Sequence, residues 1–356
     1  MGTKLGDIVD ATAISLTDLS GKKIAIDAFN TIYAFLSSIR QPDGTPLTDR
    51  QGRVTSHLSG LFYRNINLLE NGIQPVYVFD GEAPTLKARE VQKRREIREA
   101  AFIEWKTAQA EGRIEDALKA AKGSSKLTTP MIEESKSLLT ALGIPVIQAP
   151  SEGEALAAQM ARDGLVWASA SQDNDSLLYN CPLMIRNLSL SGRRRSGRSS
   201  TFKMISPELI DLDKNLRLLG ITREQLIDIA ILVGTDYNDS LTGIGQKTAL
   251  KLIKKHGTLK EVESFFKKSK NPKDKDKYEE IQTIPYSEIR DIFLNPPRVK
   301  ISAPEWSIPK SDELQKILCK EHDFSESRVQ KSLERLTSAL EELRGATHQS
   351  TLSDFF

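Results

Sequence analysis

Val76-Tyr77-Val78-Phe79-Asp80 is an uninterrupted apolar run that ends on an acid. Ile24-Ala25-Ile26-Asp27 has the same form, and Val166-Trp167-Ala168 precedes two further acids. Continuous apolar runs of this length are typical of strands that are buried on both faces of a parallel sheet. Helical patterns around residues 32–39 and 56–71 separate the first two runs. The chain therefore predicts an α/β fold, with a mostly parallel central sheet flanked by helices.

Seven acids follow these runs or later apolar runs: Asp27, Asp80, Glu152, Glu154, Asp173, Asp175 and Asp236. In an open parallel sheet, ligands bind beyond the carboxyl ends of the strands, so we expect these acids to converge on one cleft. Two carboxylates about 4 Å apart repel each other by about 4 kcal/mol at an effective dielectric near 20. Divalent cations relieve that repulsion, and an all-oxygen ligand set favours magnesium or manganese over zinc.

Two closely spaced pairs of acids need particular local geometry to share one site. Acids two apart on a regular helix point about 200° apart, so Glu152 and Glu154 must straddle the start of a helix at Pro150-Ser151. Asp173 and Asp175 share a side if their segment is extended. The alternatives are that the first pair complements a helix dipole and that the second pair consists of turn residues.

Composition narrows the classes of function. The 356 residues include 50 Lys plus Arg against 48 Asp plus Glu, so nucleic-acid binding requires segregated basic patches. The sequence has neither a membrane-length apolar stretch nor a signal-peptide pattern, which predicts a cytoplasmic protein that is not secreted. The two cysteines form no metal or disulfide motif, and the four histidines lack the spacing of zinc sites.

Residues 82–125 concentrate basic side chains, among them Lys87 and Arg94, and offer few residues that could anchor a core. Such a run is either a solvated helix face or a mobile basic helix beside the acids, since it directly follows one of them. The Arg-rich stretch 193–198 predicts an exposed loop, equally consistent with DNA contact and with plain solubility. The polar segment 267–277 predicts a surface excursion without an assigned function.

The stretch from Ser240 to Leu252 contains the turn Gly243-Ile244-Gly245, followed by a helical pattern with Lys247 and Lys251. Backbone amides at such a turn bind phosphate without reading the base sequence, as in helix-hairpin-helix elements. A Walker A loop is excluded because a glutamine separates the second glycine from the lysine. An ordinary turn between helices is the remaining alternative.

The chain ends in Gln349-Ser350-Thr351-Leu352-Ser353-Asp354-Phe355-Phe356. A charged helix from about Glu326 to Leu343 and a flexible tether at 345–348 are expected before this peptide. Two terminal aromatics and a leucine favour docking into a pocket on a partner. The alternative is a tail that folds back on its own core.

Together, these segments resemble the archaeal and eukaryotic flap endonucleases over essentially the whole chain. The resemblance is carried, in the family's order and approximate spacing, by Ile26-Asp27-Ala28, Val78-Phe79-Asp80-Gly81, residues 149–155, Ser171-Gln172-Asp173, Gly234-Thr235-Asp236-Tyr237 and Gly243-Ile244-Gly245. It implies a PIN-like 5′-nuclease fold and a structure-specific 5′ flap endonuclease with 5′–3′ exonuclease activity. The implied roles are Okazaki fragment maturation and long-patch base excision repair. An end at Phe356, without the basic tail of eukaryotic members, favours an archaeal source.

The resemblance also implies roles for individual residues. The seven acids would hold two magnesium ions, for which manganese could substitute, while Lys87 and Arg94 would contact the scissile phosphate. Tyr33 and Arg40 would contact branched DNA near the cut, and residues 82–128 would form a helical arch for the 5′ flap. In a helix-hairpin-helix element at about 228–256, the implied DNA-binding residues are Gly243, Gly245, Lys247 and Lys251, and the implied potassium ligands are the carbonyls of Ser240, Leu241 and Ile244.

The same resemblance implies a protein partner and a domain organisation. Gln349, Leu352, Phe355 and Phe356 match the peptide that binds the sliding clamp, proliferating cell nuclear antigen, and imply a monomer bound to a trimeric clamp. The implied parts are a nuclease region at 1–105 that includes the start of the arch, a second nuclease region at 106–270, a helical part at 271–344 packed on the core, and a tail at 345–356.

Two positions depart from the family pattern. Gln246 stands where proline is common, and Asn174 lies between two aspartates. Neither change removes a ligand, so we expect a slightly softer hairpin and unchanged metal binding.

Three rival functions stay open at this point. The first is another 5′ nuclease of the superfamily, such as a mismatch exonuclease, a bubble-cutting repair enzyme or a junction resolvase, which the compact arch disfavours. The second is a non-catalytic, clamp-bound DNA tether, which the complete set of acids disfavours. The third is a small PIN-like ribonuclease, which leaves the hairpin and the clamp peptide unexplained.

Overall fold

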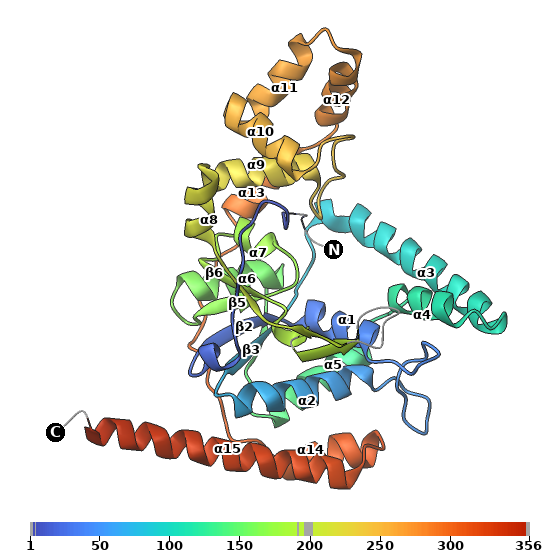
Figure 1. Ribbon diagram of the computed structural model, residues 1–356, viewed down its shortest axis with the longest axis vertical. Coiled ribbons are helices and arrows are strands. Elements are labelled where there is room, and N and C mark those ends of the chain that lie inside the picture. Colours follow the sequence, from blue (N-terminus) through green and yellow to red (C-terminus); the bar gives the residue numbers. More distant parts are fainter. Residues whose placement is uncertain (1–2, 4, 191, 196–201, 354–356) are drawn as a thin grey trace.

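The computed structural model describes all residues except 1–2, 4, 191, 196–201 and 354–356. Its centre is a seven-stranded sheet (Figure 1), formed by β1 (Thr12–Ala13), β2 (Lys23–Asp27), β3 (Gln74–Phe79), β4 (Val146–Gln148), β5 (Ala168–Ala170), β6 (Leu183–Arg186) and β9 (Glu208–Asp211). The order across the sheet is β1-β9-β6-β5-β2-β3-β4. The five strands from β6 to β4 pair in parallel, and β9 and β1 add antiparallel at one edge. The predicted mostly parallel sheet is confirmed.

The connection between β2 and β3 explains the apolar runs. β2 leads directly into α1 (Ala28–Ser38), and α2 (Ser56–Glu70) returns the chain to β3, in which Val76 to Phe79 are fully buried. β2 pairs with β3 on one side and β5 on the other, at the middle of the sheet. Because helices cover both faces of these strands, each strand position favours an apolar side chain.

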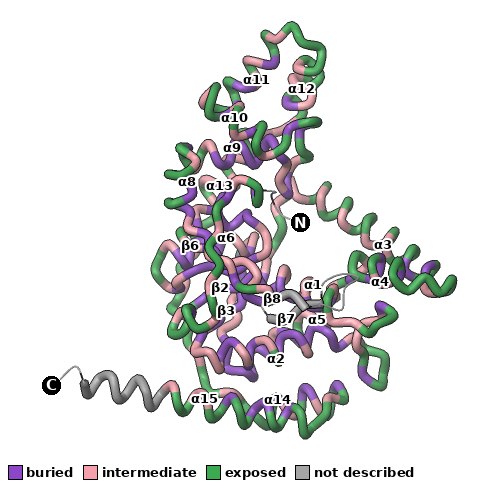
Figure 2. The backbone as a smooth tube through the Cα atoms, viewed as in Figure 1, coloured by how far each residue is buried: buried purple, intermediate pink, exposed green. Residues whose placement is uncertain are grey.

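Helices on the two faces of the sheet create two hydrophobic cores (Figure 2). One core contains residues of α1 and α2 together with residues of α5 (Thr129–Ala141), α14 (Ser311–Gln315) and α15 (Glu326–Ser353). The other core involves α6 (Gly153–Arg162), α7 (Asp175–Leu178), α8 (Leu212–Leu219), α9 (Arg223–Val233) and α13 (Tyr286–Leu294). It continues into α10 (Gln246–His256), α11 (Leu259–Lys268) and α12 (Pro272–Gln282), at the top of Figure 1. The second core therefore joins the hairpin region to the sheet.

α3 (Ala88–Ala110) and α4 (Ile114–Gly123) form a pair of helices that projects from the body of the molecule (Figure 1). Their shared cluster of buried residues, separate from the two main cores, consists of Trp105, Ala108, Ala117, Ala120 and Ala121. A short 3-10 turn, η2 (Thr85–Lys87), leads into α3 from the end of β3. Since the large apolar residues Ile97 and Ile103 are exposed, the pair adds little to the main cores, as the sequence predicted.

Two segments differ from the sequence-based expectation, and a third agrees with it. The Arg-rich stretch begins in a strand rather than a loop, because β7 (Gly192–Arg195) pairs with β8 (Phe202–Ile205); residues 196–198 lie outside the described residues. The segment 267–277 lies at the surface, as predicted, and includes the start of α12, whose first turn is capped by Asn271. α15 continues to Ser353 through the expected tether, since one glycine, Gly345, and no proline interrupt residues 326–353.

Two expectations remain, one for the C-terminal aromatic residues and one for membrane-spanning helices. Phe355 and Phe356, two residues of the predicted clamp-binding peptide, lie outside the described residues. Across the described part of the chain, none of the helices is long and apolar enough to cross a membrane.

Candidate active site and nucleic-acid interface

The sheet places the predicted acids along one edge. Asp27 is the last residue of β2, and Asp80 directly follows β3. Asp173 follows β5, and the helix start that carries Glu152 and Glu154 follows β4. All of these strands are parallel, so their carboxyl ends meet at the same edge. Asp236 reaches the cluster from the loop after α9, the helix that begins the predicted hairpin element.

A glycine lets the Asp80 carboxylate approach the start of α6. The backbone N–H of Gly153 donates to Asp80 Oδ1 at 2.6 Å. A Cβ atom on Gly153 would lie 2.7 Å from that same oxygen, closer than carbon atoms of side chains approach in real proteins. On the neighbouring strand, Asp27 caps α1 by accepting from Asn30 N–H at 3.0 Å. Backbone donors thus orient both carboxylates.

Glu152 and Glu154 straddle the start of α6, as the sequence predicted. Glu152 is the N-cap with extended backbone angles, φ −68° and ψ 127°, while Glu154 lies inside the first turn. The Ser171 hydroxyl donates to Glu154 Oε1 at 2.5 Å. The backbone changes from extended to helical between Glu152 and Glu154, and this change turns both side chains toward the same site.

Asp173 and Asp175 converge by a different route from the one expected. The segment between them is not a continuous extended strand, because Asp175 is already the first residue of α7. The Asn30 side chain donates from Nδ2 to Asp173 Oδ2 at 3.1 Å. Asp175 accepts from the backbone N–H of Thr3 at 2.8 Å. The expectation of a shared strand face was wrong, yet both acids still join the cluster.

Burial and mutual repulsion disfavour ionisation in this cluster. Burial, and then the nearby Asp80, raise the pKa of Asp27 well above its usual value. Burial and Asp175 likewise raise the pKa of Glu154. For Asp175, burial and Asp236 raise the pKa to about 6. The acids therefore lie close enough to act on one another, and a cation among them is favoured.

Lys87 supplies such a cation in this structure. Its Nζ lies 2.6 Å from Glu152 Oε2 and 3.3 Å from Asp236 Oδ2, and its side chain is only 14% exposed. Burial opposes the charge on Lys87, but Glu152 and Asp236 outweigh it and raise the pKa of Lys87. Burial raises the pKa of Glu152 despite this ion pair. The predicted basic residue is thus located inside the acid cluster.

The base of the arch is tied to the loop after α9 by further ion pairs. Arg94 contacts Asp236 through its guanidinium and also bonds Glu90 at 2.9 Å. On the same helix, Lys93 and Arg89 reach Asp239 at 2.8 and 3.1 Å. Lys87 and Arg94 therefore line the site, whereas Arg89 and Lys93 remain 88% and 54% exposed.

The predicted hairpin is the loop between α9 and α10. Gly243 has a positive φ of 74°, and Gly245 is the N-cap of α10. A Cβ atom at either glycine would meet nothing within 4 Å, so another backbone has room to approach their amides. Lys247 and Lys251 are exposed on α10. Leu241 and Ile244 are buried and attach the turn to the core.

Comparison with known proteins identifies the family. Residues 3–101 match the XPG N-terminal domain, and residues 143–236 match the XPG I-region. Flap endonuclease 1 of Pyrococcus abyssi is 50% identical over 357 residues, which span 100% of this chain and 98% of the relative. The chain belongs to the flap endonuclease family. Flap endonuclease 1 of Staphylothermus marinus is 49% identical over 96% of each chain.

Solved structures of flap endonuclease relatives share the fold. The flap endonuclease-1 from Methanococcus jannaschii has a TM-score of 0.71 at 41% identity, and the match covers 96% of this chain and 99% of that one. The catalytic core of Rad2 in complex with DNA substrate has a TM-score of 0.69 at 25% identity and covers 93% of this chain. Full-length identity to flap endonucleases establishes a nuclease and disfavours the tether and the ribonuclease.

The carboxylate oxygens of the seven acids suit the divalent ions expected in a flap endonuclease. In this structure the carboxylates do not surround a single point. No group of three or more His, Cys, Asp or Glu side chains within the described residues is arranged to hold a metal ion. An ammonium, that of Lys87, instead lies within ion-pair distance of two of the carboxylates. Carboxylate oxygens are the ligands that hard cations prefer, so the residues fit the ion once Lys87 moves aside.

Tyr33 and Arg40, whose DNA contacts are implied by the resemblance, both bond other groups of the protein. Arg98 of the arch donates to the Tyr33 hydroxyl at 2.7 Å and lies over its ring. Arg40 donates to the carbonyl of Gly44 at 2.7 Å and to Ser125 Oγ at 2.8 Å. Both residues therefore join α1 to the arch or its return segment, and their DNA contacts stay predictions.

Sequence reasoning missed several side chains that hold the acids in place. Asn30 and Ser171 bond Asp173 and Glu154 directly. Their only signal was a polar residue within a few positions of an acid at a strand end. Asn174 and Gln246, expected to have little effect, bond the N-terminal segment.

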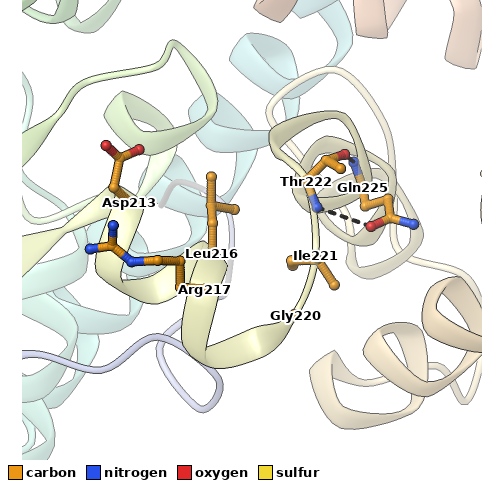
Figure 3. A pocket seen from close by; sticks show the side chains of 7 residues that line it. All are labelled: Asp213, Leu216, Arg217, Gly220, Ile221, Thr222 and Gln225. Atoms are coloured by element: carbon orange, nitrogen blue, oxygen red, sulfur yellow. Dashed lines mark hydrogen bonds between the residues drawn. The ribbon is translucent and has the colours of Figure 1, made fainter.

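One concavity of the surface lies away from the acids (Figure 3). It has a volume of about 510 Å³ and lies at the corner between α8 and α9, where Gly220 ends one helix and Thr222 caps the next. In Figure 3, Thr222 and Gln225 bond each other at the start of α9. These bonds complete a capping box, so the polar groups at this corner serve the helix start.

Proposed function

We propose that this chain is a divalent-metal-dependent endonuclease that cuts DNA at the base of 5′ flaps and has 5′–3′ exonuclease activity. The observation that carries the proposal is the gathering of seven acids at one sheet edge with Lys87 among them, on a chain 50% identical to a flap endonuclease 1. Nucleases of this family depend on divalent metal ions. Magnesium is the proposed ion, with manganese as a substitute.

The proposed metal ligands divide into two groups. Asp80, Glu152, Glu154 and Asp173 would hold one ion, Asp175 and Asp236 a second, and Asp27 would act partly through water. When bound, two such ions supply an activated water and stabilise the leaving 3′ oxygen. Burial of the acids keeps their oxygens out of bulk solvent, which strengthens their attraction for a cation.

Lys87 and Arg94 have a separate proposed role. Both now neutralise Asp236, so a metal ion that takes over this task leaves two cations free to turn toward the scissile phosphate. A cation placed where charge develops stabilises the transition state more than the bound substrate. Lys87 also stays next to the acids through its short connection to Asp80 by η2.

The hairpin and the arch form the proposed DNA-binding surface. The open amides at Gly243 and Gly245, with Lys247 and Lys251 on the following helix, suit duplex phosphates without base recognition. The carbonyls of Ser240, Leu241 and Ile244 are the proposed potassium ligands. The 5′ flap would pass the arch helices α3 and α4, with Tyr33 and Arg40 near the cut.

Cleavage of a 5′-labelled double-flap DNA tests the proposal. The expected result is a cut near the flap base with magnesium and none with EDTA, while single-stranded and blunt duplex DNA are largely spared. Binding without cutting would overturn the assignment in favour of a tether. Preferential cutting of a Holliday junction or of a nicked duplex from its 5′ end would point to another 5′ nuclease of the superfamily.

The C-terminal peptide and the cellular role form the last part of the proposal. Gln349, Leu352, Phe355 and Phe356 are proposed to bind the trimeric sliding clamp, with one monomer of this chain on the clamp. The proposed setting is Okazaki fragment maturation and long-patch base excision repair in the cytoplasm of an archaeal cell. The archaeal flap endonucleases among its relatives support this setting.

A further inference from the structure

The N-terminal segment is held unusually tightly for a chain end. Thr3 is 2% exposed and Leu5 is fully buried. The backbone N–H groups of Ile8 and Val9 both donate to the Leu5 carbonyl at 3.1 Å, which closes a turn after the buried leucine. Figure 1 draws this end of the chain beside α7. A segment fixed in this way can hold a neighbouring group in position.

One end of the segment bonds the acid cluster. The Thr3 backbone N–H donates to Asp175 Oδ1 at 2.8 Å. Asn174, the residue before this acid, donates from Nδ2 to the Thr3 carbonyl at 3.2 Å. The two polar groups of the Thr3 backbone are thus both bonded to adjacent residues at the start of α7. With one oxygen held by the backbone donor, the carboxylate loses much of its rotational freedom.

The other end of the segment bonds the hairpin. The Asp7 backbone N–H donates to Gln246 Oε1 at 2.7 Å. Gln246 is the first residue of α10 and directly follows the Gly245 cap. Thr3, Leu5 and Asp7, named here the N-terminal strut, therefore span from a proposed metal ligand to the proposed duplex-binding turn.

Packing alone does not explain the polar residues at this junction. Thr3 Oγ1 and Asn174 Oδ1 are buried and, in the part of the chain that the structure describes, have no hydrogen-bond partner. Unpaired buried polar atoms destabilise a fold, because they lose their hydrogen bonds to water without replacing them. Apolar residues would serve a purely structural contact better, so the bonds from Thr3 N–H to Asp175 and from Asn174 to the Thr3 carbonyl point to a role at the site.

We propose that the N-terminal strut positions the Asp175 carboxylate for metal binding and couples it to the hairpin, with Asn174 and Gln246 as positioning residues. This inference rests on the proposed function, because it takes Asp175 to be a metal ligand. Groups that orient metal ligands typically change metal affinity or activity by about 10–100-fold when they are removed. The strut bond at Asp175 is of this kind.

The direct test is Thr3→Pro, which removes the N–H that bonds Asp175, with Thr3→Val as the matched control that keeps it. Magnesium alone is titrated calorimetrically into each protein without DNA. The expected result is affinity lowered about 10–100-fold in the proline variant and little changed in the valine variant. Equal affinities in the two variants would overturn the proposal.

A second pair of variants tests the coupling and does not depend on how proline is tolerated. Gln246→Leu removes the acceptor for Asp7 N–H, and Gln246→Glu retains one. We expect magnesium affinity to fall by up to about tenfold for leucine, as for loss of a neutral hydrogen bond, and to recover with glutamate. A leucine variant that changed only duplex binding would refute the coupling.

The outcome also separates this inference from the proposed function. If the wild-type protein bound magnesium but did not cut flap DNA, the proposed function would fail, whereas the comparison of magnesium affinities would still decide the role of the strut. If flap cutting were normal and all four variants bound magnesium like the wild type, only the strut would be refuted.

Discussion

Replacing Lys87 by methionine keeps the length of the side chain and removes its charge from the acid cluster. The ammonium lies 2.6 Å from one carboxylate oxygen and 3.3 Å from another. At an effective dielectric near 20, these contacts correspond to gross attractions of about 6 and about 5 kcal/mol. Desolvation offsets most of this, and loss of one partner from a buried ion pair typically destabilises a protein by about 3–5 kcal/mol.

The assay is urea unfolding of the wild type and Lys87→Met in EDTA. We expect the free energy of unfolding of the variant to be lower by about 3–5 kcal/mol, because its acids keep their repulsion. Lys93→Met is the matched control for stability: Lys93 is on α3, the helix that follows Lys87, but is 54% exposed and pairs with a half-exposed acid. Its expected effect is below about 1 kcal/mol.

Magnesium should change this comparison. An ion bound by the acids replaces the lost charge, so the stability gap between Lys87→Met and the wild type should narrow at saturating magnesium. Under single-turnover conditions with magnesium, the cleavage rate should fall about 10²–10³-fold, as for removal of one transition-state donor, with little loss of DNA affinity. A variant as stable as the wild type in EDTA would refute the idea that Lys87 neutralises the acids. Equal losses in affinity and rate would make it a substrate-positioning residue.

Three further predictions concern other parts of the molecule. Asp173→Ala should abolish flap cleavage while DNA binding in a gel-shift assay stays nearly intact, and a near wild-type cutting rate would contradict its role as a metal ligand. Gly153→Ala places a Cβ 2.7 Å from Asp80 Oδ1, so Asp80 must move and cleavage should slow by about tenfold or more; an unchanged rate would show that the contact is dispensable. Deletion of Phe355 and Phe356 should spare cleavage by the isolated protein but abolish pulldown by the sliding clamp, and clamp retention by the truncated chain would disprove the docking peptide.

Parallel-sheet topology explains why the location of the acids was predictable. Apolar runs ending at Asp27 and Asp80 mark buried parallel strands, and strands of this kind end at a common edge whatever their separation in the sequence. The pair at the start of α6 followed from the change of backbone geometry at a helix cap. In each case a local pattern, repeated at distant positions, was sufficient.

Local patterns were insufficient where a helix or a long-range contact decided the outcome. Asp175 begins a helix rather than continuing an extended segment. The expected tether at 345–348 is part of α15, which continues to Ser353, since the one glycine there does not terminate a helix that long.

The sequence by itself determined the sheet, the edge on which the acids gather, their preference for hard divalent cations and the resemblance to flap endonucleases. These properties depend on residue type and on the spacing of apolar residues, and both can be recognised within short segments of the sequence. Only the tertiary structure decided that Lys87 lies among the acids and that the backbone N–H of Thr3 bonds Asp175 from 172 positions away. Such contacts form because the fold brings distant backbone and side-chain groups to one place, and no spacing within a single segment encodes them.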